Sequence, residues 1–148
     1  MAEDIRDRAA DALLALIPLY YKNVMRNRHT INGVQLAQIH TLGVLMKYRS
    51  VPMSEIGSRL YISRPYMTRL ADIMIADGLV ERQPDSHDRR VINLTITEKG
   101  KKYLKESISW YKKDLKENFT SLDDHDVRKL CAAIEEANQI LAKLQQER

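Results

Sequence analysis

Residues 53–102 constrain the fold more than any other part of the chain, because strong helix signals are followed there by a strong strand signal. A short helix is predicted over residues 54–60 from its apolar spacing. Ser63 can cap a second helix with its hydroxyl group, and Pro65 falls in the first turn, where its missing N–H does no harm. Gly78 can close this helix in the left-handed conformation. Two short helices in close succession are therefore expected, the second with an inward face made of Met67, Leu70, Ala71 and Met74.

An alternating strand follows the second helix. Ile92, Leu94 and Ile96 share one of its faces, and mostly polar residues share the other. Together with residues 79–83 this strand predicts an antiparallel β-hairpin. The connecting loop, residues 85–90, has the sequence Asp-Ser-His-Asp-Arg-Arg and is therefore rich in charge.

Helical periodicity dominates the rest of the chain. Helices are predicted over residues 4–26 and 34–48, from Thr97 to Phe119, and from about Asp123 onward. The 34–48 helix is expected to turn four positions inward: Leu36, Ile39, Leu42 (or Gly43) and Met46. The predicted class is mainly α, with about six helices and one small antiparallel β-hairpin.

The first and last helices carry more apolar surface than a single core requires. The first has two adjoining apolar stripes, where one would serve a monomer. The stripes are Ile5, Ala9, Leu13, Leu16, Tyr20 and Val24, and beside them Ala10, Leu14, Ile17 and Tyr21. The last helix has a heptad seam of Val127, Leu130, Ile134, Ala137, Leu141 and Leu144. Packing on the chain's own core and sharing of the seam between two subunits both remain open.

Composition narrows the class of protein. The chain has 148 residues, a net charge of +4 and a pI near 9.2, which is a mild bias toward polyanions. Between residues 51 and 105, ten Lys or Arg stand against seven Asp or Glu. The single cysteine, Cys131, excludes an internal disulfide. No stretch approaches the ~20 apolar residues that span a bilayer, and the acidic N-terminus is unlike a signal peptide. A soluble, cytoplasmic protein is expected.

The residues between Glu55 and Gly100 resemble the MarR family of winged helix-turn-helix transcription regulators. The matching residues are Glu55-Ile56-Gly57, Thr68-Arg69-Leu70, Asp77-Gly78-Leu79-Val80-Glu81-Arg82, Asp88-Arg89-Arg90, Leu94-Thr95 and Glu98-Lys99-Gly100. Helix order and length match over nearly the whole chain. The resemblance implies a single winged helix-turn-helix domain that dimerises through its N- and C-terminal helices. The implied bounds are 1–148 for the domain, 4–31 and 103–148 for the dimerisation helices, 34–100 for the winged part, 54–77 for the helix-turn-helix and 79–97 for the wing.

Three positions depart from the family's usual pattern. Ile73 and Ile75 stand where the family mostly has polar or basic residues, on the outer side of the second helix of the motif. Either this helix packs against something extra, or its C-terminal half contributes less to phosphate binding. His87 stands where a charged residue is common, so the positive charge of the loop is not maximal.

By resemblance, the second helix of the motif enters the major groove of DNA, where its N-terminal residues meet base edges. The candidate DNA contacts on this recognition helix are Ser63, Arg64, Pro65, Tyr66, Thr68 and Arg69. Arg64 suits a guanine base, because a guanidinium group can bond guanine at two atoms. Arg69 suits a phosphate. For both arginines the alternative is a solvated surface charge.

The wing supplies a second set of candidate DNA contacts, Arg89 and Arg90, with Asp88 orienting Arg90. The resemblance implies that Arg90 enters the minor groove, where a narrow A·T-rich stretch concentrates negative potential, and that Arg89 lies along the phosphates. The alternative is a hairpin stabilised only by an exposed ion pair, worth ~0–1 kcal/mol.

Many members of the family lose DNA affinity when a small, often aromatic ligand binds between the dimer region and the DNA-binding part. The candidate effector-pocket residues are Tyr20, His40, Trp110 and Tyr111. Their aromatic surfaces and few polar tips suit a phenolic compound, although core or dimer packing explains each of them as well. The expected function is a homodimeric repressor that a ligand releases from a pseudo-palindromic operator on double-stranded DNA.

Other function classes fit the sequence less well. The alternative function is a winged-helix module that binds another protein without binding specific DNA, but the arginines at both reading positions argue against it. No Gly-rich phosphate loop or nucleophile elbow is present, so an enzyme is not expected. The histidines His29, His40, His87 and His125 lack metal-ligand spacing, and no metal or cofactor is expected. Cys131 is expected to be a buried thiol beside the seam.

Overall fold

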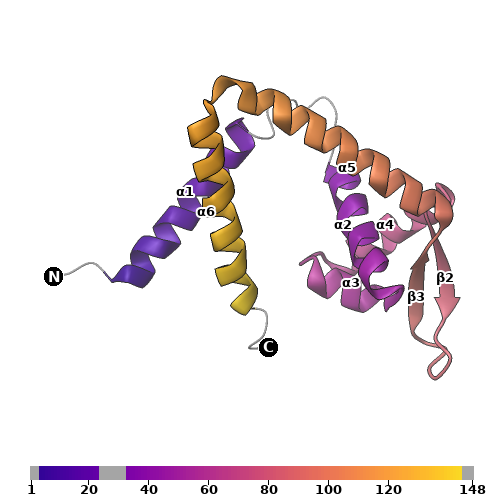
Figure 1. Cartoon of the computed structure of the whole chain (residues 1–148). Coiled ribbons are helices and arrows are strands. Elements are labelled where there is room, and N and C mark those ends of the chain that lie inside the picture. The colour runs from indigo at the N-terminus through magenta and orange to yellow at the C-terminus, as the bar shows by residue number, and fades with distance from the viewer. Residues whose placement is uncertain (1–3, 24–32, 145–148) are drawn as a thin grey trace. The chain divides into compact units, whose positions relative to one another are not determined.

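The structure is a computed structural model that describes residues 4–23 and 33–144 (Figure 1). The elements in chain order are α1 (Ile5–Asn23), α2 (Gly33–Tyr48), β1 (Ser50–Pro52), α3 (Met53–Arg59), α4 (Arg64–Ala76), β2 (Val80–Pro84), β3 (Ile92–Ile96), α5 (Glu98–Asn118), the 3-10 helix η1 (Phe119–Ser121) and α6 (Asp124–Lys143). The predictions for residues 24–31 and 145–148 lie outside the described residues. The chain divides into two compact units, Met1–Val24 with Lys112–Arg148, and Met25–Tyr111. The prediction of a single domain stays a prediction, and the boundary between the units falls within α5.

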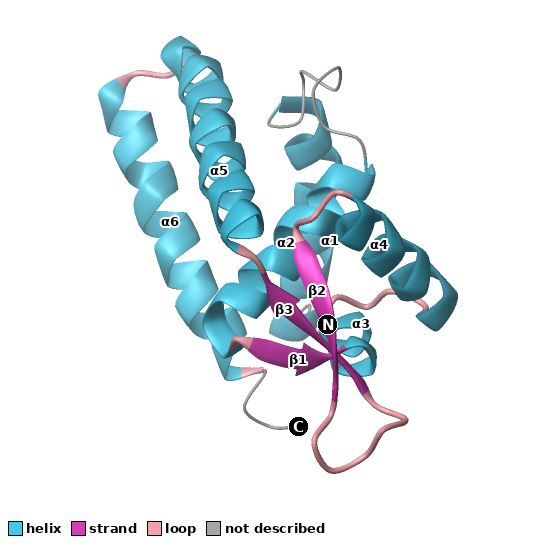
Figure 2. Ribbon diagram, turned by 90° about the vertical axis from the view of Figure 1, so that its right-hand side faces the viewer, coloured by secondary structure: helices cyan, strands magenta, loops and turns pink. Residues whose placement is uncertain are grey.

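A three-stranded antiparallel sheet with the order β1-β3-β2 lies in the unit Met25–Tyr111 (Figure 2). β2 and β3 pair from Val80 with Ile96 to Pro84 with Ile92, which confirms the predicted hairpin. The sequence did not predict β1, which pairs Val51 with Leu94 on the other side of β3. Three residues ending in proline carry too little alternation to be recognised as a strand. β3 is therefore held on both edges, and the hairpin extends from a fixed base.

The core of this unit is formed by α2, α3, α4 and the sheet. Its fully buried large side chains are Leu42, Leu45, Ile56, Met67, Leu70, Met74, Val80 and Leu94. Burial of each such side chain stabilises the fold by ~1.5–3 kcal/mol relative to exposure. The predicted inward face of the recognition helix is confirmed, because the buried residues of α4 are Met67, Leu70, Ala71 and Met74.

The predicted inward face of α2 is confirmed at Leu42 and wrong at Met46, while Leu36 and Ile39 are half-buried. Leu42 is buried, but Met46 is 51% exposed, and the polar residues Gln38 and Thr41 are buried in its place. The Tyr103 hydroxyl group of α5 donates to Gln38 Oε1 at 3.3 Å, which partly satisfies this buried amide. α2 has apolar residues on almost every side, so its sequence pattern does not decide which side faces the core.

The ends of α4 are formed as the sequence predicted. Ser63 is the N-cap, and its Oγ accepts a hydrogen bond from the backbone N–H of Tyr66 at 3.3 Å. Pro65 lies in the first turn. Gly78 follows the helix with a φ of 72°, a left-handed conformation that glycine adopts without a steric penalty. The chain thus turns directly from the recognition helix into β2.

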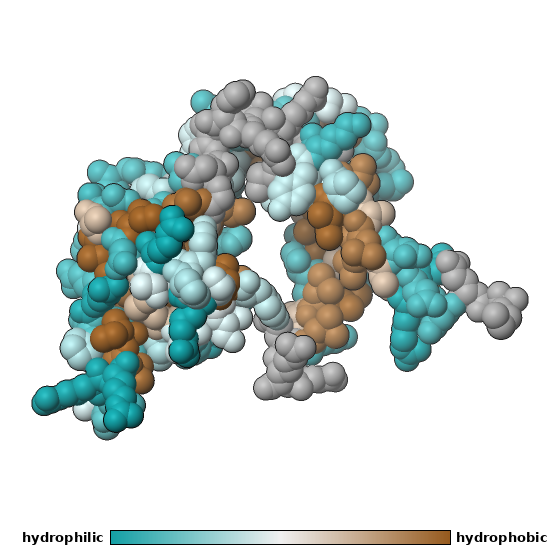
Figure 3. Space-filling model, turned by 180° about the vertical axis from the view of Figure 1, so that it is seen from behind, coloured by the Kyte–Doolittle hydropathy of each residue, from teal (hydrophilic) through white to brown (hydrophobic). Residues whose placement is uncertain are grey.

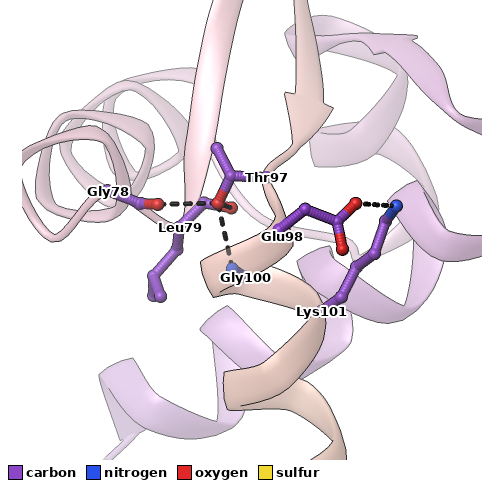
Figure 4. A network of polar contacts seen from close by, with 6 residues as sticks. All are labelled: Gly78, Leu79, Thr97, Glu98, Gly100 and Lys101. Atoms are coloured by element: carbon purple, nitrogen blue, oxygen red, sulfur yellow. Dashed lines mark hydrogen bonds and ion pairs between the residues drawn. The ribbon is translucent and has the colours of Figure 1, made fainter.

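A polar junction fixes the start of α5 against the end of α4 (Figure 4). Thr97 Oγ1 donates to the carbonyl oxygen of Gly78 at 2.7 Å and lies 3.1 Å from that of Leu79. The same oxygen accepts a hydrogen bond from the backbone N–H of Gly100 at 2.9 Å. Gly100 lies so close to the preceding chain that a Cβ there would be 2.1 Å from the Leu79 carbonyl oxygen. Only glycine fits at this point of contact.

The unit Met1–Val24 with Lys112–Arg148 exposes large apolar side chains along α1 and α6, and Figure 3 shows apolar surface gathered on it. These side chains are all at least 38% exposed: Ile5, Leu13, Leu14, Leu16, Ile17, Leu19, Tyr20 and Tyr21 on α1, and Leu130, Ile134, Ile140, Leu141 and Leu144 on or at the end of α6. Among the described residues, no side chain of α6 is buried. Among the described residues, the two stripes of α1 and most of the seam of α6 are therefore exposed.

Within residues 4–23 and 33–144, none of the helices combines the length and the apolar character needed to cross a bilayer.

Replacing Gly100 by alanine should lower the free energy of unfolding by about 3 kcal/mol, because the added methyl group must displace the Leu79 backbone. The matched control is Gly43→Ala in α2, where no described atom lies within 4 Å of an added Cβ. That change should stabilise the helix by up to ~1 kcal/mol. Urea denaturation measures both, and similar effects of the two substitutions would contradict the close approach at Gly100.

Candidate nucleic-acid interface

The N-terminal half of α4 presents its candidate contacts to solvent. Arg64, Pro65, Thr68 and Arg69 are exposed, and Tyr66 is half-buried. This follows from the helix repeat, since the buried face occupies the opposite side of α4. The Thr68 hydroxyl group donates to the carbonyl oxygen of Arg64 at 3.1 Å. That hydroxyl group is thus occupied by the helix backbone.

The loop of the hairpin exposes the wing candidates Arg89 and Arg90. Asp88 Oδ1 accepts a hydrogen bond from the backbone N–H of Arg90 at 2.9 Å. The backbone N–H of Val91 donates to the Asp88 carbonyl oxygen, also at 2.9 Å. Asp88 therefore acts on Arg90 by shaping the backbone of the turn, in the manner of an Asx turn. The ion pairs found among the described residues do not include Asp88.

A groove of about 510 Å³ brings the two sets of candidates together. Arg64 and Thr68 of α4 and Arg90 of the wing line it. The remaining lining residues are Met53, Ser54, Gly57, Ser58, Ile62, Met67, Val91 and Ile92. Two guanidinium groups and several hydroxyl groups at one groove suit a ligand with anionic oxygen atoms. The groove is not lined by the other candidates, Ser63, Pro65, Tyr66, Arg69 and Arg89.

An ion pair that the sequence did not predict joins the recognition helix to the wing. Arg82 of β2 donates through a guanidinium nitrogen to the carboxylate of Asp72 on α4. Both side chains are about half exposed, so the pair contributes little to stability, typically 0–1 kcal/mol. Its effect is to neutralise the acidic group on the outer side of the recognition helix. The residues are ten positions apart in different elements, and no local spacing rule connects them.

A second cationic cluster lies at the end of α2. The guanidinium carbon of Arg59 is 4.5 Å from the ring centroid of Tyr48, and Lys47 Nζ is 5.2 Å from it. Hydrogen bonds from Lys47 and Arg59 lower the pKa of the Tyr48 phenol. Arg59 Nη2 also pairs with Glu55 Oε1 at 2.6 Å, which directs the guanidinium group along α3.

The effector-pocket candidates are spread over the two units. Tyr20 belongs to α1 in one unit, and His40, Trp110 and Tyr111 belong to the other. Trp110 and Tyr111 pack edge to face, with ring centroids 5.8 Å apart. His40 lines a hollow of about 420 Å³ next to α4, together with Leu36, Ala37, Leu60, Ile62, Ser63 and Tyr66. A shared pocket of the four candidates stays a prediction.

The described residues form no candidate metal site. Within residues 4–23 and 33–144 no group of three or more His, Cys, Asp or Glu side chains could hold a metal ion, and His29 lies outside them. Cys131 is exposed, so the expectation of a buried thiol is wrong; none of the described side chains of α6 is buried. Its Sγ lies 3.4 Å from Glu135 Oε1, and this contact raises the pKa of the thiol.

Comparison with known proteins gives consistent matches. A model of the MarR family matches residues 32–91. The HTH-type transcriptional repressor MdtR of Bacillus subtilis is 37% identical over 46% of this chain and 44% of its own length. The transcriptional repressor MprA of Escherichia coli K12 is 34% identical over 57% of this chain and 48% of its own length. The chain thus spans about half the length of these curated relatives.

Solved structures resemble this chain over more of its length than the two curated relatives do. The transcriptional regulator BldR from Sulfolobus solfataricus superposes with a TM-score of 0.70 at 22% identity, covering 95% of this chain and 99% of that one. A MarR family protein from Bacillus stearothermophilus gives 0.69 at 23% identity over 92% and 97%. At these identities the likeness concerns the fold, which is that of a winged helix with additional terminal helices.

Asp88→Asn should leave the wing turn intact, because the amide oxygen can accept the same hydrogen bond from Arg90, whereas Asp88→Ala should lose it. The expected loss is about 1 kcal/mol of local stability. Hydrogen exchange of the Arg90 backbone amide measures it directly. If asparagine were as disruptive as alanine, the carboxylate charge would matter more than the turn.

Proposed function

We propose that the chain is a member of the MarR family and a sequence-specific DNA-binding transcription regulator acting as a homodimer, because residues 32–91 match a model of that family. The observation that carries the proposal is the groove in which Arg64 of α4 and Arg90 of the wing lie together. If Arg64 and Arg90 had pointed away from each other, the structure would have indicated a different DNA-binding surface. Relatives described as transcriptional repressors support the same function class, which is one of binding proteins and not of enzymes.

The recognition helix would enter the major groove of B-DNA, which is wide enough for one α-helix. Its exposed residues Arg64, Pro65 and Thr68 would face the bases or the nearby backbone. Arg64 would bond a guanine edge at two atoms, and Arg69 would hold a phosphate. The wing would follow the backbone with Arg89 and place Arg90 in a narrow minor groove, where negative potential is strongest.

A homodimer would supply a second recognition helix and a second wing. Two recognition helices about 34–36 Å apart read successive half-sites of one duplex, which raises affinity far above that of one copy. The uncovered apolar faces of α1 and α6 are the candidate pairing surface. A large apolar surface along two helices suits the hydrophobic interior of a permanent dimer interface.

Release by a small aromatic or phenolic ligand is the proposed mode of control, and repression is the proposed outcome. The hollow beside His40 supports a ligand site, because its walls are mostly apolar and it touches Ser63 and Tyr66 at the start of α4. A ligand there would act on the helix that reads the bases. We propose the cytoplasm as the location of this activity.

Binding of the full chain to the DNA upstream of its own gene tests the proposal. Affinity should exceed that for a scrambled duplex of equal composition by a thousand-fold or more, as a rough scale for specific over non-specific binding. A panel of aromatic acids added to the complex tests release. Equal affinity for both duplexes at physiological salt would favour the alternative, a winged-helix module that binds another protein.

Arg89→Ala and Arg90→Ala should each flatten the plot of log K against log salt concentration by about one unit per lost phosphate contact. Arg128→Ala on α6 is the matched control, since this arginine is also exposed but lies outside the winged part. Fluorescence anisotropy at several salt concentrations measures the slopes. Unchanged slopes in both wing variants would remove the wing from the mechanism.

Ile134→Glu should convert the protein into a monomer, because a carboxylate in the seam of α6 cannot be buried unpaired against a second copy. DNA affinity should then fall about a hundred-fold or more. Met46→Glu on α2 is the control, since Met46 is similarly exposed, at 51% against 49% for Ile134. Light scattering after size-exclusion chromatography gives the mass, and a dimeric Ile134→Glu variant would argue against pairing through this seam.

A further inference from the structure

We propose that Ile73 determines specificity by contacting the 5-methyl group of a thymine in the major groove. This inference rests on the proposed function, because it assigns a role to one more residue of the same DNA-binding surface. Ile73 is 39% exposed and stands on α4, the helix proposed to read the bases. The exposed part of this side chain is available for contact with an apolar group of the DNA.

The helix repeat places Ile73 beside the proposed contacts. Successive residues of an α-helix turn by about 100° and rise by about 1.5 Å. Ile73 follows Arg69 by four residues, so it lies about 40° around the axis from Arg69 and about 6 Å further along it. The buried face of α4, which includes Leu70 and Met74, lies on the other side of Ile73. Ile73 therefore extends the exposed strip of Arg69 by one turn.

Two polar side chains of α4, Thr68 and Asp72, are already engaged in hydrogen bonds within the protein. The hydroxyl group of Thr68 is bound to the Arg64 carbonyl oxygen, which leaves the threonine methyl group as its free part. The carboxylate of Asp72 is paired with Arg82, so the acidic group next to Ile73 does not stand uncompensated before the phosphates. The outer side of α4 thus offers a cation at Arg69 and apolar groups around it.

Thymine supplies the matching chemistry. Its 5-methyl group is the apolar group that the major groove displays, and apolar side chains contact it in DNA complexes. Burying one methyl group between isoleucine and thymine is worth about a four-fold gain in affinity. A basic residue at this position would bind a phosphate and add affinity for any sequence. Isoleucine instead favours an A·T pair at one defined step.

The proposal also fixes how α4 lies on DNA. Ile73 is nine residues from Arg64, or about 13 Å along the axis. Nine residues are about two and a half turns, so Ile73 and Arg64 lie on opposite sides of the helix axis. Both can meet bases only if α4 lies along the groove and reaches bases from both of its sides. A helix inserted end-on would keep Ile73 clear of the bases, and Ile73 would then have no effect on thymine recognition.

Uracil substitution separates this contact from all others, because deoxyuridine differs from thymidine by the methyl group alone. High-affinity duplexes are first selected from a random-sequence library with the full wild-type chain. Each thymine in a selected half-site is then replaced by deoxyuridine, one at a time. Affinities are measured for the wild type, Ile73→Ala and Ile73→Val. Met46→Ala on α2 is the matched control, since Met46 is 51% exposed and lies outside both the recognition helix and the proposed dimerisation helices.

One thymine should show a penalty of about four-fold on conversion to uracil with the wild type. Ile73→Ala should lose that penalty, Ile73→Val should keep part of it, and Met46→Ala should keep all of it. The inference is overturned if every uracil penalty is the same in the wild type and Ile73→Ala, or if Ile73→Ala changes the oligomeric state instead. Failure to select any duplex would refute the proposed function itself.

Discussion

Gly100 lies where the first turn of α5 meets the carbonyl group of Leu79, and four elements are joined at this point. Thr97 follows β3, and its hydroxyl group donates to the carbonyl oxygen of Gly78, which follows α4. Leu79 leads directly into β2. The position of the wing relative to the recognition helix is therefore set by backbone contacts at a junction too tight for any side chain. Side-chain changes on the exposed faces can alter what is bound without moving this frame.

The charges of the candidate interface act mainly through their placement. Exposed ion pairs such as Asp72 with Arg82 add little to folding stability, because water solvates both partners well. Next to a polyanion such as the proposed DNA partner, the same charged groups would have a larger effect, on binding. A neutralised Asp72 no longer repels phosphates, while Arg64 and Arg90 stay available at one groove. The modest net charge of +4 is thus less informative than the position of a few cations.

Local signals in the sequence predicted the recognition helix and hairpin well. Ser63, Pro65 and Gly78 define the ends of α4 by their own chemistry, so neighbours in space are not needed to find them. Strand β1 escaped prediction because its three residues are ordered by pairing with β3. The inward side of α2 was predicted correctly at Leu42 and wrongly at Met46, because tertiary packing buries Gln38 and Thr41 instead of a more apolar side chain. The sequence likewise named Arg64 and Arg90 separately, but only the fold unites them at one groove.

The link from α4 to β2 through Gly78, Leu79 and the Asp72–Arg82 pair would restrict the operators that the proposed regulator tolerates. In each protomer of the proposed dimer, this link would fix the offset between the major-groove and minor-groove contacts, so a half-site would have a single allowed length. Tolerance for insertions would then reside in the spacer between half-sites, where it would measure the compliance of the pairing helices and the torsional stiffness of the duplex.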